Sequence, residues 1–142
     1  MDANAEVLLV KKNGCIILQL RDDKPEITNP GFVSSFGGKI EYGETPQEAA
    51  LREIREETNL RPRLTELVYF GKYRKNKDVH GEDWDVYYFL LNDVEDRGLE
   101  VYEGRGYVVL DGKSSMGNYK LTTLLKEVLE DYFGSLLQNK DR

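Results

Sequence analysis

The feature that most constrains this chain is a helix-forming segment that carries three closely spaced glutamates. Glu53, Glu56 and Glu57 lie within about one helical turn of one another, so a helix would place their carboxylates on one face. Like charges at this spacing cost an isolated helix about 0.2–0.5 kcal/mol per pair, and the C-terminal end of a helix disfavours further negative charge. A hard divalent cation such as Mg²⁺, with Mn²⁺ as a substitute, binds carboxylate oxygens and reverses the repulsion. The spacing therefore indicates a metal site, against the alternative of a solvated acidic helix.

The flanking residues predict where this helix begins and ends. Residues 45–48, Thr-Pro-Gln-Glu, form a capping-box pattern with proline at the first helical position. Ala50, Leu51 and Ile54 form an apolar stripe that would pack against a core. Asn59 follows the last turn, where a left-handed residue commonly ends a helix, so we expect it to adopt that conformation.

Glycines before the helix extend the pattern. Gly37, Gly38 and Gly43 permit a loop that approaches a ligand closely. With them, residues 38–60 resemble the Nudix hydrolase signature, a long motif of fixed spacing. The matching positions are Gly38, Glu44, Arg52, Glu53, Ile54, Glu56, Glu57 and Leu60. The final glycine of the motif is replaced by Asn59, which tolerates a left-handed backbone.

The resemblance implies both a fold and a reaction. The implied fold is an α/β/α sandwich with a mixed β-sheet, over a single domain of residues 1–142. The implied reaction is metal-dependent hydrolysis of a pyrophosphate bond in a nucleoside diphosphate linked to another group, by attack of water on phosphorus. A nucleoside triphosphate and a nucleotide sugar both remain open as substrates. The alternative is a Nudix-fold module that senses a nucleotide without hydrolysing it, although every carboxylate position of the motif is filled.

The resemblance also assigns roles within the motif. The implied metal ligands are the carboxylates of Glu53, Glu56 and Glu57 and the backbone carbonyl of Gly38. Arg52 would orient the carboxylates by salt bridges to Glu48 and Glu56, each four residues away. Glu44 would support the loop or bind metal through water. The general base is Glu53 or Glu56, or else a carboxylate outside the motif, with Asp83, Asp85, Glu100 and Glu103 as candidates.

Substrate contacts are expected outside the motif. Arg21 lies where a predicted strand enters a loop and could hold a phosphate group. Trp84 and Tyr87, with Tyr88 beside them, could stack on a base, although alternation along a strand lets only one face line a pocket. His80 is the only histidine and fits a surface residue of a charged loop better than a catalytic group. Residues 75–78 lack the markers of ADP-ribose and dinucleoside polyphosphate hydrolases.

The composition of the chain limits the kinds of molecule that it can bind. The 142 residues can bury one core, and the net charge of −6 argues against a broad nucleic-acid-binding surface. The apolar run near the N-terminus is too short for a signal peptide or a membrane span, so we expect a cytoplasmic protein with a small nucleotide as its partner. The single cysteine, Cys15, excludes an intrachain disulfide and is expected to be buried and inert. The oligomeric state is left open between a monomer and a homodimer.

Periodicity predicts a mixed α/β chain. Two strands, 5–10 and 15–20, are expected to form a hairpin through an Asn-Gly turn. Further strands are predicted at residues 32–36, 64–73, 84–91 and 107–110, with the third and fourth of these six strands flanking the glycine loop and helix. The strands at 64–73 and 84–91 are expected to pair antiparallel. An amphipathic helix is predicted over residues 119–133.

Overall fold

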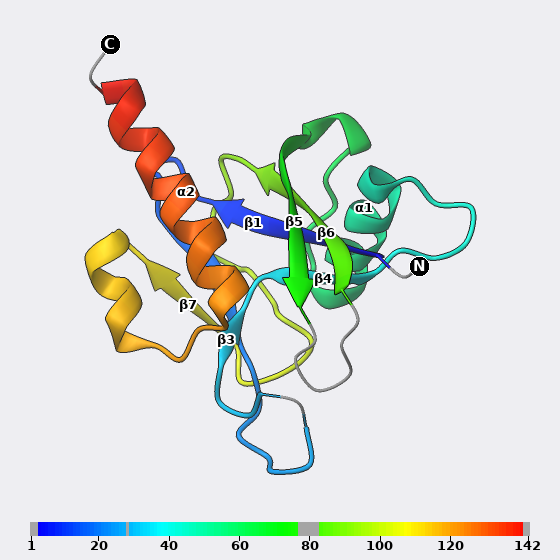
Figure 1. The fold of residues 1–142 in the computed structure, drawn as a ribbon, viewed down its shortest axis with the longest axis horizontal. Coiled ribbons are helices and arrows are strands. Elements are labelled where there is room, and N and C mark those ends of the chain that lie inside the picture. The colour runs from blue at the N-terminus through cyan, green and yellow to red at the C-terminus, as the bar shows by residue number, and fades with distance from the viewer. Residues whose placement is uncertain (1–2, 28, 77–82, 141–142) are drawn as a thin grey trace.

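Within the described residues, seven strands form a mixed β-sheet that carries the rest of the chain (Figure 1). The computed structural model describes residues 3–27, 29–76 and 83–140. The strands are β1 (Ala3–Val10), β2 (Ile16–Leu20), β3 (Val33–Ser34), β4 (Phe36–Lys39), β5 (Leu67–Asn76), β6 (Asp83–Leu91) and β7 (Tyr107–Leu110). The helices are α1 (Pro46–Glu57) and α2 (Thr123–Lys140), with short 3₁₀ segments η1 (Leu64–Glu66) and η2 (Lys113–Asn118).

Strand β1 lies at the centre of the sheet. The strand order is β3-β2-β1-β6-β5, and β4 also pairs with β1 while β7 pairs with β2. The pairing of β1 with β6 is parallel and sets Glu6 opposite Tyr88. The pairing of β1 with β4 is antiparallel and sets Glu6 opposite Gly37. Strand β1 therefore positions groups from both β4 and β6.

Two apolar cores lie on opposite faces of the sheet, because successive side chains of β1 point in opposite directions. Leu8 packs in a core with Leu129 of α2, whereas Val7 packs in a second core with Ile54 of α1. Each of these side chains is fully buried, which contributes about 1.5–3 kcal/mol apiece. Figure 1 shows α1 and α2 on the two sides of the sheet. The fold is thus the predicted α/β/α sandwich with a mixed sheet.

Most predicted elements are present with shifted boundaries. Strands β5 and β6 pair antiparallel as expected, and β7 matches its predicted range. The segment 32–36 divides at Ser35 because the chain stops pairing with β2 and begins pairing with β1. Helix α2 begins at Thr123 instead of Tyr119, since η2 precedes it and the Thr122 hydroxyl accepts a hydrogen bond from the Leu125 N–H. Neither described helix is long and apolar enough to cross a membrane.

The predicted start of α1 is confirmed. The Thr45 hydroxyl accepts a hydrogen bond from the Glu48 N–H at 3.1 Å, and the Glu48 carboxylate accepts one from the Thr45 N–H at 2.9 Å. Pro46 occupies the first helical position, where its missing N–H leaves no bond unmade. The helix therefore has a fixed beginning, and its register sets where every later side chain of the motif points.

The predicted end of α1 is wrong. Asn59 does not have a positive φ, and the helix ends instead at Thr58, whose backbone is extended. The Asn59 side chain reaches across to a distant loop, where its Nδ2 donates to the Gly98 carbonyl and its Oδ1 accepts from the Glu100 N–H, both at 2.9 Å. The Asn59 N–H also donates to the Glu100 carbonyl at 3.2 Å. Asn59 thus fastens residues 98–100 to the end of α1 and does not act as a left-handed cap.

Strand β4 carries two glycines because side chains and backbone occupy both of its sides. Gly37 has φ +152°, and a Cβ there would overlap the Ala5 carbonyl and the side chain of Glu6. A Cβ on Gly38 would lie 2.5 Å from a carboxylate oxygen of Glu53. The glycine pair therefore lets two carboxylates approach the strand closely.

We predict that Gly37→Ala lowers the free energy of unfolding by at least about 2 kcal/mol. Overpacking and a positive φ each cost about 1–3 kcal/mol, and the obstructing atoms include backbone that cannot rotate away. Denaturant unfolding measures the effect. Gly117→Ala is the control, because no atom lies within 4 Å of its added Cβ. Equal losses in the two variants would show that β1 and β4 are not closely packed at Gly37.

We predict that Asn59→Ala and Asn59→Gly both lower the free energy of unfolding by about 1–3 kcal/mol, because each leaves a backbone carbonyl and a backbone N–H without the amide partner. Thermal unfolding compares them with the control Asn118→Ala, at an exposed position. If Asn59→Gly stabilised the protein, the side-chain bridge to residues 98–100 would be irrelevant.

Candidate active site

The guanidinium of Arg52 binds several of the acidic side chains around α1. Its Nε and Nη2 donate to the two carboxylate oxygens of Glu44 at 2.7 and 3.0 Å, and Nη2 also donates to the Lys39 carbonyl at 2.9 Å. Its Nη1 lies 3.0 Å from Glu53 and 3.3 Å from Glu56. Arg52 therefore contacts Glu56, as expected, but meets Glu44 where Glu48 was expected, because Glu48 is held in the capping box.

Glu57 lies on the inner side of α1, against β4. It is buried, and its Oε2 accepts a hydrogen bond from the Gly37 N–H at 3.1 Å. Burial raises the pKa of Glu57 well above its usual range, and contact with the Glu53 carboxyl raises it further. Two carboxyl groups thus meet in a site with little water, an arrangement that favours either a shared proton or a bound cation.

Glu56 is turned away from this pair. Its side chain is 58% exposed, compared with 14% for Glu53, and its contact is with Arg52. In the parts of the chain that the structure describes, no three acidic, histidine or cysteine side chains gather around one point. The three motif glutamates therefore do not share one face as the helical spacing suggested, since one is buried, one is intermediate and one is exposed.

The donor set nevertheless fits a hard cation. Every available donor is an oxygen: the carboxylates of Glu53 and Glu57, the carboxylate of Glu56, which shares Arg52 with Glu53, and the backbone carbonyl of Gly38, a residue that lies against the Glu53 carboxylate. Mg²⁺ is usually bound through one or two carboxylates and completes its octahedral shell with water and substrate phosphates. The contact between Glu53 and Glu57 supplies those two carboxylates.

One of the outside carboxylates approaches this site. Residues 98–103 dock on the end of α1, where the Tyr102 N–H donates to the Glu57 carbonyl at 2.9 Å, and the charge of Glu103 raises the Glu57 pKa. Asp83 and Asp85 instead form ion pairs with Arg74, and the Glu100 backbone is bound by Asn59. His80 lies outside the described residues. Of the outside candidates for a general base, Glu103 is thus the one whose charge acts on Glu57.

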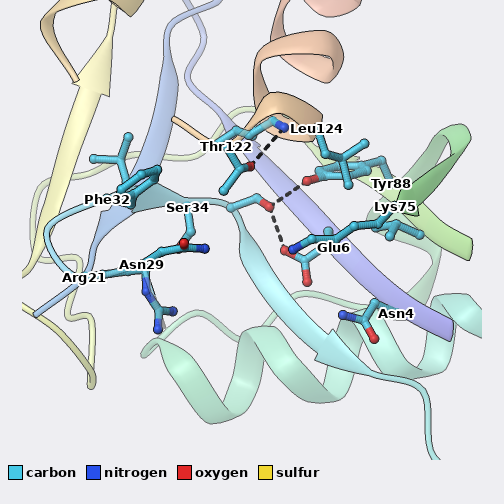
Figure 2. A pocket seen from close by; sticks show the side chains of 14 residues that line it. Asn4, Glu6, Arg21, Asn29, Phe32, Ser34, Lys75, Tyr88, Thr122 and Leu124 are labelled. Carbon is cyan, nitrogen blue, oxygen red and sulfur yellow. Dashed lines mark hydrogen bonds between the residues drawn. The ribbon is translucent and has the colours of Figure 1, made fainter. Parts of the chain in front are cut away.

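A pocket of about 210 Å³ opens on the α2 side of the sheet (Figure 2). Strands β1, β3, β5 and β6, the loop that follows β2, and the start of α2 with the residue before it all contribute to it. Its lining is Asn4, Glu6, Arg21, Asn29, Phe32, Val33, Ser34, Ser35, Lys75, Val86, Tyr88, Thr122, Leu124 and Leu125. The pocket therefore combines aromatic and apolar walls with a few charged groups, as ligand pockets commonly do.

The predicted substrate contacts are only partly found here. Arg21 lines this pocket and also a neighbouring depression with Tyr102 and Glu103. Tyr87 does not line the pocket, because β6 turns it toward the α1-side core, and Tyr88 takes that position from the opposite face. Trp84 packs beside the α2-side core with the Lys75 ammonium 5.5 Å from its ring centre, and it is also absent from the lining.

Glu6 is the pocket residue that sequence reasoning missed. The Ser35 hydroxyl donates to its Oε1 at 2.6 Å, and the Tyr88 hydroxyl lies 3.0 Å from the same Ser35 oxygen. Burial raises the pKa of Glu6 to about 7, although the bond from Ser35 opposes this. A signal was present in the sequence, since Glu6 interrupts an apolar strand on the face shared with Leu8 and Val10.

Comparison with known families agrees with this fold. A family model described as the NUDIX domain matches residues 1–105. That match includes β1 to β6, α1 and the segment that carries Glu103. The chain therefore belongs to the NUDIX domain family.

Individual relatives match only part of this chain, at about one third sequence identity. The chain is 32% identical over 108 residues to an RNA pyrophosphohydrolase of Cereibacter sphaeroides, which covers 63% of this chain and 62% of that protein. It is 34% identical over 83 residues to an ADP-ribose pyrophosphatase of Methanocaldococcus jannaschii, covering 58% of this chain and 46% of that protein. The chain thus spans about three fifths of the first relative's length and under half of the second's.

Solved structures share the fold. The E. coli dihydroneopterin triphosphate pyrophosphohydrolase aligns with a TM-score of 0.72 at 18% identity, over 94% of this chain and 95% of that one. The MutT protein of Methanosarcina mazei Go1 aligns with a TM-score of 0.70 at 21% identity, over 92% and 91% of the two chains. At these identities the likeness supports the fold alone.

We predict that the metal-free protein loses stability as the pH rises from about 5 to about 8. The raised pKa values of Glu57 and Glu6 mean that the folded chain keeps protons which the unfolded chain has released, so a higher pH favours unfolding. One such group contributes at most about 1.4 kcal/mol per pH unit. Melting temperatures measured with a chelator test this, and Glu57→Gln should flatten the curve where the control Glu127→Gln does not. Parallel curves for all three proteins would contradict the assignment.

Proposed function

We propose that this chain is a Nudix pyrophosphohydrolase that depends on Mg²⁺, with Mn²⁺ as a substitute. Its substrate would be a nucleoside diphosphate linked to another group, with nucleoside triphosphates and nucleotide sugars as the candidates. Water would attack one phosphorus, the bridging P–O bond would break, and the leaving phosphate would take the electron pair. The attacking water would lose its proton to a carboxylate.

The observation that carries the proposal is the contact between Glu53 and Glu57 beside the glycine strand. This contact is unfavourable unless a proton or a cation compensates it. Arg52 holds Glu53 from the solvent side, and Gly38 leaves room for its carboxylate on the other. Glu6, which lines the pocket, is close enough to this contact for its charge to act on Glu57. A phosphate-binding end and a ring-binding end would therefore adjoin each other.

A bound divalent ion would shield the phosphate charge and lower the pKa of the attacking water. The chain's own residues would do the rest. Glu53, Glu57 and Glu56 would hold the ion with the Gly38 carbonyl, and Arg52 would keep Glu53 and Glu56 oriented. The proton would pass to Glu53 or Glu56, or to Glu103 from the docked loop. Arg21, which lines the pocket, would contact a phosphate or the sugar.

A substrate panel tests the proposal. Nucleoside triphosphates, nucleotide sugars, ADP-ribose and 5′-triphosphorylated RNA would be incubated with Mg²⁺ or Mn²⁺, and the release of phosphate, pyrophosphate and nucleoside monophosphate measured. Metal-dependent cleavage of at least one compound is expected. Binding of nucleotides without any turnover would contradict the proposal and support the nucleotide-sensing module instead.

We predict that Glu53→Gln and Glu56→Gln each lower kcat at saturating Mg²⁺ by about 100-fold or more, because each removes a charged oxygen from the metal and base positions. The melting temperature should change little for Glu56→Gln, whose side chain is largely exposed. Glu127→Gln, on the exposed face of α2, is the matched control. Near-normal kcat in either motif variant would show that the residue is neither a ligand nor the base.

A further inference from the structure

Glu6 places a carboxylate on a strand face that is otherwise apolar. Its neighbours on that face, Leu8 and Val10, are buried in the α2-side core. A carboxylate in such a place costs stability unless it is hydrogen bonded, and the Ser35 hydroxyl supplies one bond of 2.6 Å. Gly37 leaves space for the carboxylate, since a Cβ there would overlap it. Local geometry therefore holds a carboxyl group at the pocket wall that the core does not need.

The Glu6 carboxylate can accept further hydrogen bonds from a ligand in the pocket. An ionised carboxylate only accepts, and its two oxygens offer about four acceptor sites, of which Ser35 uses one. Tyr88 is 3.0 Å from the Ser35 oxygen, so the three groups form a connected set that fixes the carboxylate. A ligand that presents two neighbouring N–H groups would satisfy both oxygens at once.

Lys75 supplies the complementary group. It lines the same pocket, and its charge acts on the Glu6 carboxyl. Figure 2 shows Lys75, Glu6 and Tyr88 along one wall. An ammonium only donates, so it would bind a ring oxygen next to the N–H groups that Glu6 binds.

The rest of the pocket suits a flat ring. Phe32, Val86 and Leu124 supply aromatic and apolar surface. The volume of about 210 Å³ is below the roughly 300–1,000 Å³ of pockets for drug-sized ligands. The pocket is therefore of a size to take a single ring system.

We propose that Glu6 and Lys75 select guanine nucleotides, with Glu6 accepting hydrogen bonds from N1–H and the 2-amino group and Lys75 donating to O6. Adenine presents an acceptor at N1, and uracil presents a single ring N–H, so neither matches this pair. Hypoxanthine keeps O6 and N1–H but lacks the 2-amino group. The inference rests on the proposed function for the identity of the ligand class, and it adds the choice of base.

Kinetics with GTP, ITP and ATP test the inference. The expected kcat/KM for GTP exceeds that for ITP by about tenfold and that for ATP by about 100-fold, as for the loss of one and of several hydrogen bonds to charged groups. In Glu6→Gln the preference for GTP over ITP should fall to within about threefold through a higher KM for GTP, with kcat nearly unchanged. Glu127→Gln should keep the wild-type ratios. Equal kcat/KM for the three nucleotides in the wild-type protein would overturn the inference and leave the hydrolase proposal intact.

Binding of the monophosphates separates the two proposals. Calorimetry with GMP, IMP and AMP requires no turnover, so a preference for GMP in a protein without hydrolase activity would support base selection and contradict catalysis. Glu6→Gln should weaken GMP binding about tenfold and AMP binding little. An equal loss for GMP and AMP would assign Glu6 a purely structural role and overturn the inference.

Discussion

The bidentate ion pair between Arg52 and Glu44 is the interaction on which the geometry of the acidic site around Glu53 and Glu57 depends. It joins the helix to the loop that precedes it, and the same guanidinium reaches the carbonyl of Lys39 at the end of β4. Charge-assisted bonds of this kind are about twice as strong as neutral ones. These bonds therefore fix the spacing between α1, the loop that precedes it and strand β4. That spacing determines where Glu53 can place its carboxylate.

The second constraint is how closely other groups can approach the backbone of β4. Strand β4 has no side chains at Gly37 and Gly38, so carboxylates from β1 and α1 lie close to it. Glu6 belongs to the pocket side and Glu57 to the side of α1, where the Gly37 N–H binds it. The charge of Glu6 raises the pKa of Glu57 across this short separation. Larger side chains at Gly37 and Gly38 would move the pocket beside Glu6 away from the contact between Glu53 and Glu57.

Local sequence signals predicted the local structure. The capping box at Thr45 and the apolar stripe around Ile54 depend on residues within one or two helical turns, and both appear as expected. The Nudix pattern gave the family, and with it the sandwich, because that motif is long and its spacing is fixed. These features required no knowledge of how distant segments pair.

Features that depend on distant segments could not be predicted in the same way. Asn59 resembles a helix cap in sequence, but its amide binds a loop about forty residues away, which local pattern does not reveal. Choosing between Tyr87 and Tyr88 required knowing which face of β6 the pocket occupies. The place of Glu6 at the pocket depends on the parallel pairing of β1 with β6, which sets it opposite Tyr88. The motif roles of Glu53, Glu56, Glu57 and Gly38 remain predictions.

The residues at the start of α2 affect how proteins of this fold can diversify. Thr122, Leu124 and Leu125 form one wall of the pocket, yet they lie beyond residue 105, where the family match ends. Arg52 and its partners belong to the matched segment, whereas these three residues follow it. Mutations in that wall can alter the shape offered to a ligand without disturbing Arg52 or its partners. One part of the pocket wall can therefore vary separately from the rest of the lining, which belongs to the matched segment together with Arg52.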